Sequence, residues 1–127
     1  MNRQKIIFLV VLAAVGLFIA SMVASMFATK QALPNGYALS VGGKGEAWVQ
    51  STDRKTLVTD VTSVWASPDR MLIERREPDT TKPHSYLDCD YLATEGKGAP
   101  HSVSKAEALA LAPGLKRETA SSKTCIQ

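Results

Sequence analysis

The 127-residue sequence has almost no excess of charge of one sign once its first residues are set aside. Of its 15 lysines and arginines, all but Arg3 and Lys5 follow residue 28, and these nearly balance the 12 aspartates and glutamates. A nucleic-acid footprint would need basic residues clustered on one face, and the sequence holds no such cluster. We therefore expect no nucleic-acid partner.

The sequence also lacks a catalytic or cofactor-binding motif. No nucleophile stands beside a histidine in a known pattern. The glycine cluster at residues 42–45 is followed by Glu46 on an expected strand, whereas a phosphate-binding loop leads into a helix. We expect no cofactor and, in the main interpretation, no enzyme.

One alternative to that interpretation stays open. His84, Asp88 and Asp90 share a parity along an expected strand over residues 84–94. Three such side chains on one face would suit a metal site or a small hydrolase. Ordinary exposed polar alternation explains the same pattern, and the main interpretation assigns no metal.

Charge is absent altogether from residues 6–28, which form the longest apolar run of the chain. As a helix these residues would reach roughly 34 Å, enough for a hydrocarbon core of about 30 Å. The alternative is a cleaved signal peptide, but cleavage after Ala24 or Ala28 would put a methionine three positions before the cut, where small residues are favoured. We predict an uncleaved transmembrane anchor.

The flanks of this run predict its orientation. Arg3 and Lys5 precede it, so residues 1–5 are expected to form a cytoplasmic tag and the rest to be exported. Small residues at four-residue spacing would let two such helices approach closely and form a homo-oligomer. This possible helix-pairing stripe consists of Gly16, Ala20, Ala24 and Ala28.

The chain after the anchor is expected to form one small, mainly β (α+β) domain. Residues 29–35 are predicted as a linker and residues 36–127 as the exported domain. Alternating and β-branched residues predict an antiparallel meander of 4–5 strands. The expected strands lie near residues 37–41, 46–51, 56–66, 71–77 and 84–94.

A single short helix is expected near the C-terminus. Ser104 and Glu107 have the spacing of a capping box, and Pro113 with Gly114 ends the apolar run that follows. Ala106, Leu109 and Ala110 would be on the side of this helix that packs on the sheet.

Cys89 and Cys125 are the only cysteines, and both lie in the part expected to be exported. In an oxidising compartment, two cysteines in one small domain indicate a disulfide. A reactive or metal-binding thiol is disfavoured because Asp88 and Asp90 would raise the pKa of the Cys89 thiol. We predict the Cys89–Cys125 disulfide.

The segment Leu33-Pro34-Asn35-Gly36-Tyr37 and the strand–turn–strand order up to Leu92 resemble small exported bacterial domains of unknown function. That resemblance implies an antiparallel sheet shaped like a single propeller blade. It implies no catalytic residues.

Together these features predict a single-pass protein of the bacterial inner membrane, with a cytoplasmic N-terminus and a periplasmic C-terminal domain. It would act by protein binding, as an accessory subunit or envelope interaction module. Its partners would be the membrane and another membrane or envelope protein. The alternatives are a periplasmic or secreted binder or inhibitor released by signal cleavage, and the small hydrolase or metal site on His84, Asp88 and Asp90.

Overall fold

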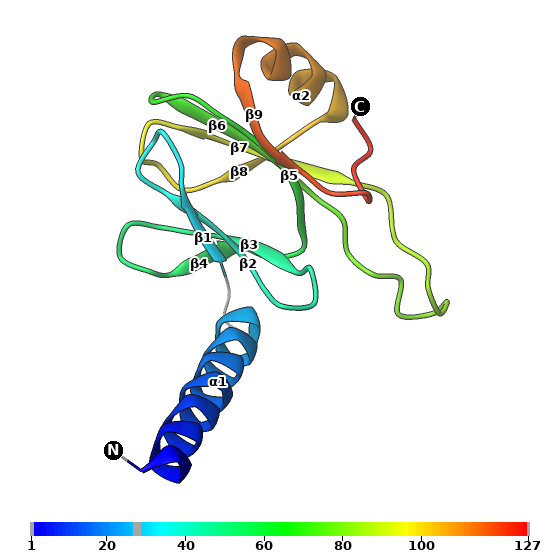
Figure 1. Cartoon of the computed structure of the whole chain (residues 1–127). Coiled ribbons are helices and arrows are strands. Elements are labelled where there is room, and N and C mark those ends of the chain that lie inside the picture. The colour runs from blue at the N-terminus through cyan, green and yellow to red at the C-terminus, as the bar shows by residue number, and fades with distance from the viewer. Residues whose placement is uncertain (1, 27–28, 127) are drawn as a thin grey trace.

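The computed structural model describes residues 2–26 and 29–126, with the side chains of the first helix described up to residue 19. One long helix precedes a β-rich domain that carries a second, short helix (Figure 1). The elements are α1 (Arg3–Met26), β1 (Thr29–Ala32), β2 (Ala38–Val41), β3 (Ala47–Gln50), β4 (Thr56–Val58), β5 (Val61–Ala66), β6 (Arg70–Arg75), β7 (Asp90–Glu95), β8 (His101–Val103), α2 (Lys105–Leu111), the 3-10 turn η1 (Ala112–Gly114) and β9 (Lys116–Ala120).

The described strands form two antiparallel sheets. The first has the order β1-β2-β3-β4, and the second has the order β8-β7-β6-β5-β9. The chain passes from one sheet to the other between β4 and β5, where Asp60 has a φ of 54°. Asp tolerates this left-handed conformation better than most residues, and the carbonyl of Asp60 accepts a 2.9 Å hydrogen bond from the backbone N–H of Arg76.

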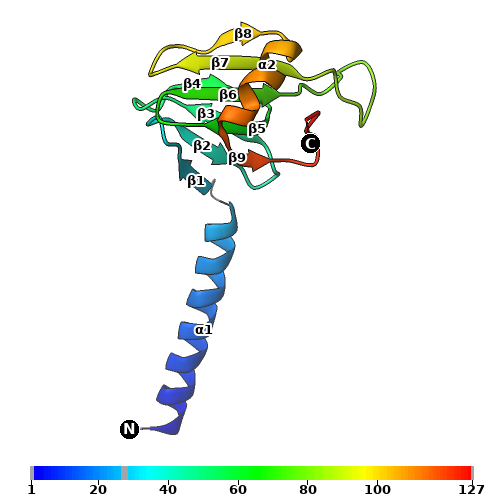
Figure 2. The same ribbon diagram turned by 90° about the horizontal axis from the view of Figure 1, so that it is seen from above.

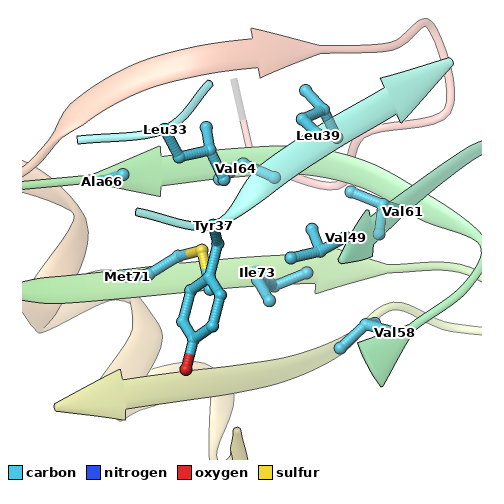
Figure 3. Close-up of a cluster of buried hydrophobic side chains, with 10 residues drawn as sticks. All are labelled: Leu33, Tyr37, Leu39, Val49, Val58, Val61, Val64, Ala66, Met71 and Ile73. Atoms are coloured by element: carbon cyan, nitrogen blue, oxygen red, sulfur yellow. The ribbon is translucent and has the colours of Figure 1, made fainter. Parts of the chain in front are cut away.

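The main hydrophobic core lies between the two sheets (Figure 3). Leu39 and Val49 enter it from the first sheet, and Val64 and Ile73 enter it from the second. Because strand residues alternate between faces, Leu72 and Glu74 of β6 point away from this core.

A second apolar cluster covers the outer face of the five-stranded sheet. Trp65, Leu72 and Tyr91 of the sheet pack there with Ala108 of α2. In Figure 1, α2 lies on the side of this sheet that faces away from the four-stranded sheet. The domain therefore has three layers, and all six residues of β5 are buried because both faces of the strand are covered.

The Ser104 cap is confirmed. The backbone N–H of Glu107 donates to the Ser104 hydroxyl at 3.1 Å, which begins α2 at Lys105. The predicted packing side of the helix is wrong. Ala108 is fully buried, whereas Leu109 is 49% exposed, since the helix is rotated so that Ala108 and Leu111 meet the sheet.

The predicted transmembrane anchor is wrong. Among the described residues, no helix is long and apolar enough to cross a membrane. The large apolar side chains described in α1 lie at residues 6–12, 15 and 17–19. These side chains are exposed, from 47% at Ile6 to 71% at Leu17, and α1 projects away from the β domain (Figure 2).

The predicted single meander is also wrong. Residues 29–32, expected to be linker, form β1 and pair along their whole length with β2. Two sheets replace the single blade-like sheet, because the chain breaks at Asp60 within the predicted strand over residues 56–66. Residues 101–103 and 116–120, which lie outside the predicted strands and helix, form the two edge strands of the second sheet.

Candidate functional site

The predicted disulfide is present. The sulfurs of Cys89 and Cys125 are bonded, and the bond joins the residue just before β7 to the C-terminal segment after β9. Closing a loop of 36 residues constrains the unfolded chain and stabilises a small domain by about 3–4 kcal/mol. The bond therefore holds the C-terminal segment against the outer face of the second sheet.

Under this segment lies Glu74, a carboxylate that is fully buried. Its Oε1 accepts hydrogen bonds from the hydroxyl of Thr62 at 2.6 Å, the hydroxyl of Thr124 at 2.7 Å and the backbone N–H of Cys125 at 3.1 Å. Its Oε2 accepts one from the hydroxyl of Tyr91 at 3.0 Å. We call Glu74 and these four donors the Glu74 network.

The Glu74 network satisfies a buried charge without a cation. Neither ion pair found among the described residues includes Glu74. Burying a carboxylate is costly unless hydrogen bonds replace the lost water, and four donors do so here. Two of the donors, Thr124 and Cys125, come from the C-terminal segment, so the network and the disulfide fasten the same part of the chain.

Tyr91 packs in the second apolar cluster and donates a hydrogen bond to Glu74. Burial, reinforced by its hydrogen bond to Glu74 and by the charge of that carboxylate, raises the pKa of the Tyr91 phenol well above its ordinary value of 10.0. The phenol therefore stays protonated and keeps donating to Glu74 Oε2.

A cleft opens beside the Glu74 network, between loops from separate parts of the chain. We call it the loop cleft. It has a volume of about 480 Å³, and Thr62, whose hydroxyl binds Glu74, forms part of its wall. The residues that characterise it are Lys44, Asp60, Arg76, Tyr86, Ser122 and Lys123.

Tyr86 is the aromatic centre of the loop cleft. The Lys123 ammonium lies 4.5 Å from the centroid of its ring, and the Arg76 guanidinium lies 5.8 Å from it. Both distances fit cation–π contacts. Arg76 is also fixed by hydrogen bonds from its Nε to the carbonyl of Leu87 at 2.8 Å and from Nη1 to the carbonyl of Lys123 at 3.4 Å.

The charges in the loop cleft favour an anionic ligand. Lys44, Arg76 and Lys123 line it together with Glu46 and Asp60. The Glu46 carboxylate is already engaged by the backbone N–H of Lys44 at 3.1 Å. The cleft therefore presents an aromatic ring with two cations above it.

A second, mostly apolar pocket lies between α2 and the five-stranded sheet, with a volume of about 300 Å³. Ala93, Val103 and Leu111 are among its apolar lining residues. Arg70, Glu95 and Glu107 also line it, so the pocket holds charges of both signs and indicates no particular ligand.

In the structure, no single strand carries His84, Asp88 and Asp90, the residues of the hydrolase or metal alternative. β7 begins only at Asp90, and His84 lies in a turn with a φ of 60°. In the described part of the chain, the group of potential metal ligands that comes together is Glu74, Cys89 and Cys125. His84, Asp88 and Asp90 do not form such a group there.

The helix-pairing stripe falls largely outside the described side chains. Gly16 lies in α1, and a Cβ placed on it would meet no other atom within 4 Å. The side chains of Ala20 and Ala24, and all of Ala28, lie outside the described residues. The stripe stays a prediction.

Sequence reasoning missed Glu74 and the loop cleft. In the sequence, Arg75 and Arg76 between Glu74 and Glu77 are typical of a solvated, charge-balanced strand end, and nothing local shows that residues 124–125 return over it. One signal was available, because a Cys89–Cys125 bond must bring the C-terminus close to the strands beside Cys89.

Comparison with known proteins gives no match, since no family model, curated protein or solved structure matches the chain. The function is therefore inferred from the geometry of this chain alone.

Proposed function

We propose that the β domain is an exported binding module that recognises a partner protein through the loop cleft. The observation that carries the proposal is Tyr86, in cation–π contact with Arg76 and Lys123 at the meeting point of separate loops. Loops on a rigid scaffold are the usual place for binding residues. Tyrosine and arginine are the side chains that most often dominate binding energy.

The disulfide supports export. Bonds of this kind form and persist in oxidising compartments and are rare in the cytosol. Here the Cys89–Cys125 bond also positions Lys123, which stands two residues before Cys125. The recognition surface would therefore depend on the compartment in which the bond forms.

The chemistry of the loop cleft supports a partner with an exposed carboxylate. An Asp, a Glu or a chain terminus could reach the ammonium of Lys123 and the guanidinium of Arg76 while its aliphatic part packs on Tyr86. Such charge pairs steer association and fix register.

We favour the form of this proposal in which cleavage of an N-terminal signal releases the β domain. The two described core clusters include no residue of α1, so the β domain would keep its core without that helix. The intact mass of the mature protein tests this form. A mass below 13.7 kDa by the weight of α1 is expected, and the full mass would contradict release.

Site-specific photo-crosslinking in cells tests the binding proposal. A photoreactive amino acid replaces Ser122, which lines the loop cleft and is exposed. The matched control replaces Ser102, an equally exposed serine on β8, at the edge of the five-stranded sheet opposite β9. We expect a discrete protein adduct from position 122 and none from position 102. Equal adducts from both positions, or none from position 122, would contradict the proposal.

A further inference from the structure

The sulfurs of Cys89 and Cys125 and a carboxylate oxygen of Glu74 all lie within 4.8 Å of one another. Two sulfurs and a carboxylate oxygen are the ligand types that Zn²⁺ accepts in proteins. In the oxidised chain the two sulfurs are bonded to each other. The three groups become available to a metal only when that bond is opened.

We propose that the reduced protein binds one Zn²⁺ ion through the Cys89 thiolate, the Cys125 thiolate and the Glu74 carboxylate. A dithiol reductant opens the bond by thiol–disulfide exchange: two electrons and two protons reach the cysteine sulfurs, and the reductant becomes a disulfide. Zinc then displaces the two thiol protons into solvent and forms two Zn–S bonds and one Zn–O bond. A water molecule supplies the fourth ligand.

The geometry needs only small movements. With Zn–S bonds of about 2.3 Å and a Zn–O bond of about 2.0 Å, the ligand atoms of a tetrahedral site are about 3.5–3.8 Å apart. Reduction lets the two sulfurs separate to such a distance, while a carboxylate oxygen of Glu74 lies within 4.8 Å of both sulfurs.

The surroundings of Glu74 suit a metal ligand. The Tyr91 and Thr62 hydroxyls fix its carboxylate, and hydrogen bonds of this kind orient the ligands of metal sites. Burial is graded across the three groups: Glu74 is buried, Cys89 is half-buried and Cys125 is exposed. Zinc and its water ligand therefore have an entry path on the Cys125 side.

Zinc in this site would replace the disulfide as the link between β7 and the C-terminal segment. Lys123 would then keep its place near Tyr86 after reduction. The inference does not rest on the proposed function, because it concerns the reduced chain and needs no partner protein.

The test is a zinc titration of the reduced protein, freed of reductant under anaerobic conditions, against a chromophoric chelator. We expect one tight site in the reduced chain and none in the oxidised chain. Glu74→Gln should weaken binding at least about tenfold, and Cys89→Ser should abolish the site. The matched control is Glu95→Gln, at the exposed last residue of β7, which should bind zinc as the wild type does. No binding by the reduced wild type, or unchanged binding by Glu74→Gln, would overturn the proposal.

A measurement on the wild type covers the case in which Glu74→Gln fails to fold. Co²⁺ added to the reduced protein should give thiolate-to-cobalt charge-transfer absorption and the intense visible bands of tetrahedral coordination. Zinc should bleach these bands stoichiometrically and raise Tm by about 10 °C at a hundredfold excess of free zinc over Kd. Octahedral, weak bands without charge transfer would overturn the thiolate site.

Discussion

At the scale of single residues, Glu74 shows how a charge can lie in the interior without a cation. Its two oxygens accept four hydrogen bonds, from Thr62, Tyr91, Thr124 and the backbone of Cys125. Two of these donors lie on strands of the second sheet or beside them, and two lie in the C-terminal segment. The network is therefore complete only when that segment is folded back.

Removing one donor should be costly. Tyr91→Phe leaves Glu74 Oε2 buried without its 3.0 Å hydrogen bond. We expect the free energy of unfolding to fall by about 1–3 kcal/mol, as measured by urea denaturation. The control is Tyr86→Phe, which keeps the ring of an exposed tyrosine and should change stability by less than about 0.5 kcal/mol. Equal effects of the two substitutions would count against the Glu74 network.

The raised pKa of Tyr91 makes a pH prediction. In the unfolded chain the phenol ionises near pH 10, whereas in the folded chain burial and Glu74 keep it protonated to higher pH. Its contribution to stability is therefore fully present below pH 10 and is lost as the pH rises above 10. Urea denaturation at several pH values should show the wild type losing more stability above pH 10 than Tyr91→Phe. Parallel losses would show that Tyr91 ionises freely in the folded chain.

The sequence predicted the cysteine pair but not the residue beneath it. Two cysteines allow only one pairing, so whether the disulfide forms depends only on the compartment. Glu74 is different, because burial depends on which segment covers a strand face, and the covering residues stand 50 positions further along the chain. Local patterns hold no information at that separation.

At the scale of elements, the structure agrees with the sequence where side-chain patterns are strong. The hairpin of β2 and β3, the strand β6 and the cap at Ser104 were all predicted from local residues. β8 and β9 were missed because HSV and KRETA are polar, and an edge strand with one exposed side needs few apolar residues. β1 was missed for the same reason, since all four of its residues are exposed.

The cap of α2 is testable at this scale. Ser104→Ala removes the acceptor for the backbone N–H of Glu107. We expect a loss of about 1 kcal/mol in the free energy of unfolding, measured by chemical denaturation. Ser122→Ala, in the exposed C-terminal segment, serves as the control and should be close to neutral. A neutral Ser104→Ala would show that packing of Ala108 alone holds the helix.

At the scale of the whole molecule, two sheets and α2 form three layers, and the loop cleft lies where the loops of both sheets meet the C-terminal segment. The sequence could not predict this arrangement, because the switch between sheets depends on the backbone at Asp60. It also could not place Tyr86, Arg76 and Lys123 together, because the Cys89–Cys125 disulfide positions Lys123.

Binding through the loop cleft predicts a charge-reversal effect. Lys123→Glu should weaken the partner's affinity by at least about tenfold, because it places a negative charge over Tyr86 where an acidic group would bind. The matched control is Lys116→Glu, an exposed lysine on the edge strand β9. Affinity is measured with the partner identified by crosslinking, at two salt concentrations. Equal losses from both variants would indicate only a general charge effect.

The most direct test of the proposed export and of the Cys89–Cys125 disulfide is the oxidation state of the two cysteines in living cells. Cells are quenched with an alkylating reagent under denaturing conditions, and the mass of the protein is measured before and after reduction. We expect no alkylation before reduction and two alkylated cysteines, Cys89 and Cys125, after it. Two cysteines alkylated without reduction would contradict both the exported location and the disulfide that positions Lys123 in the loop cleft.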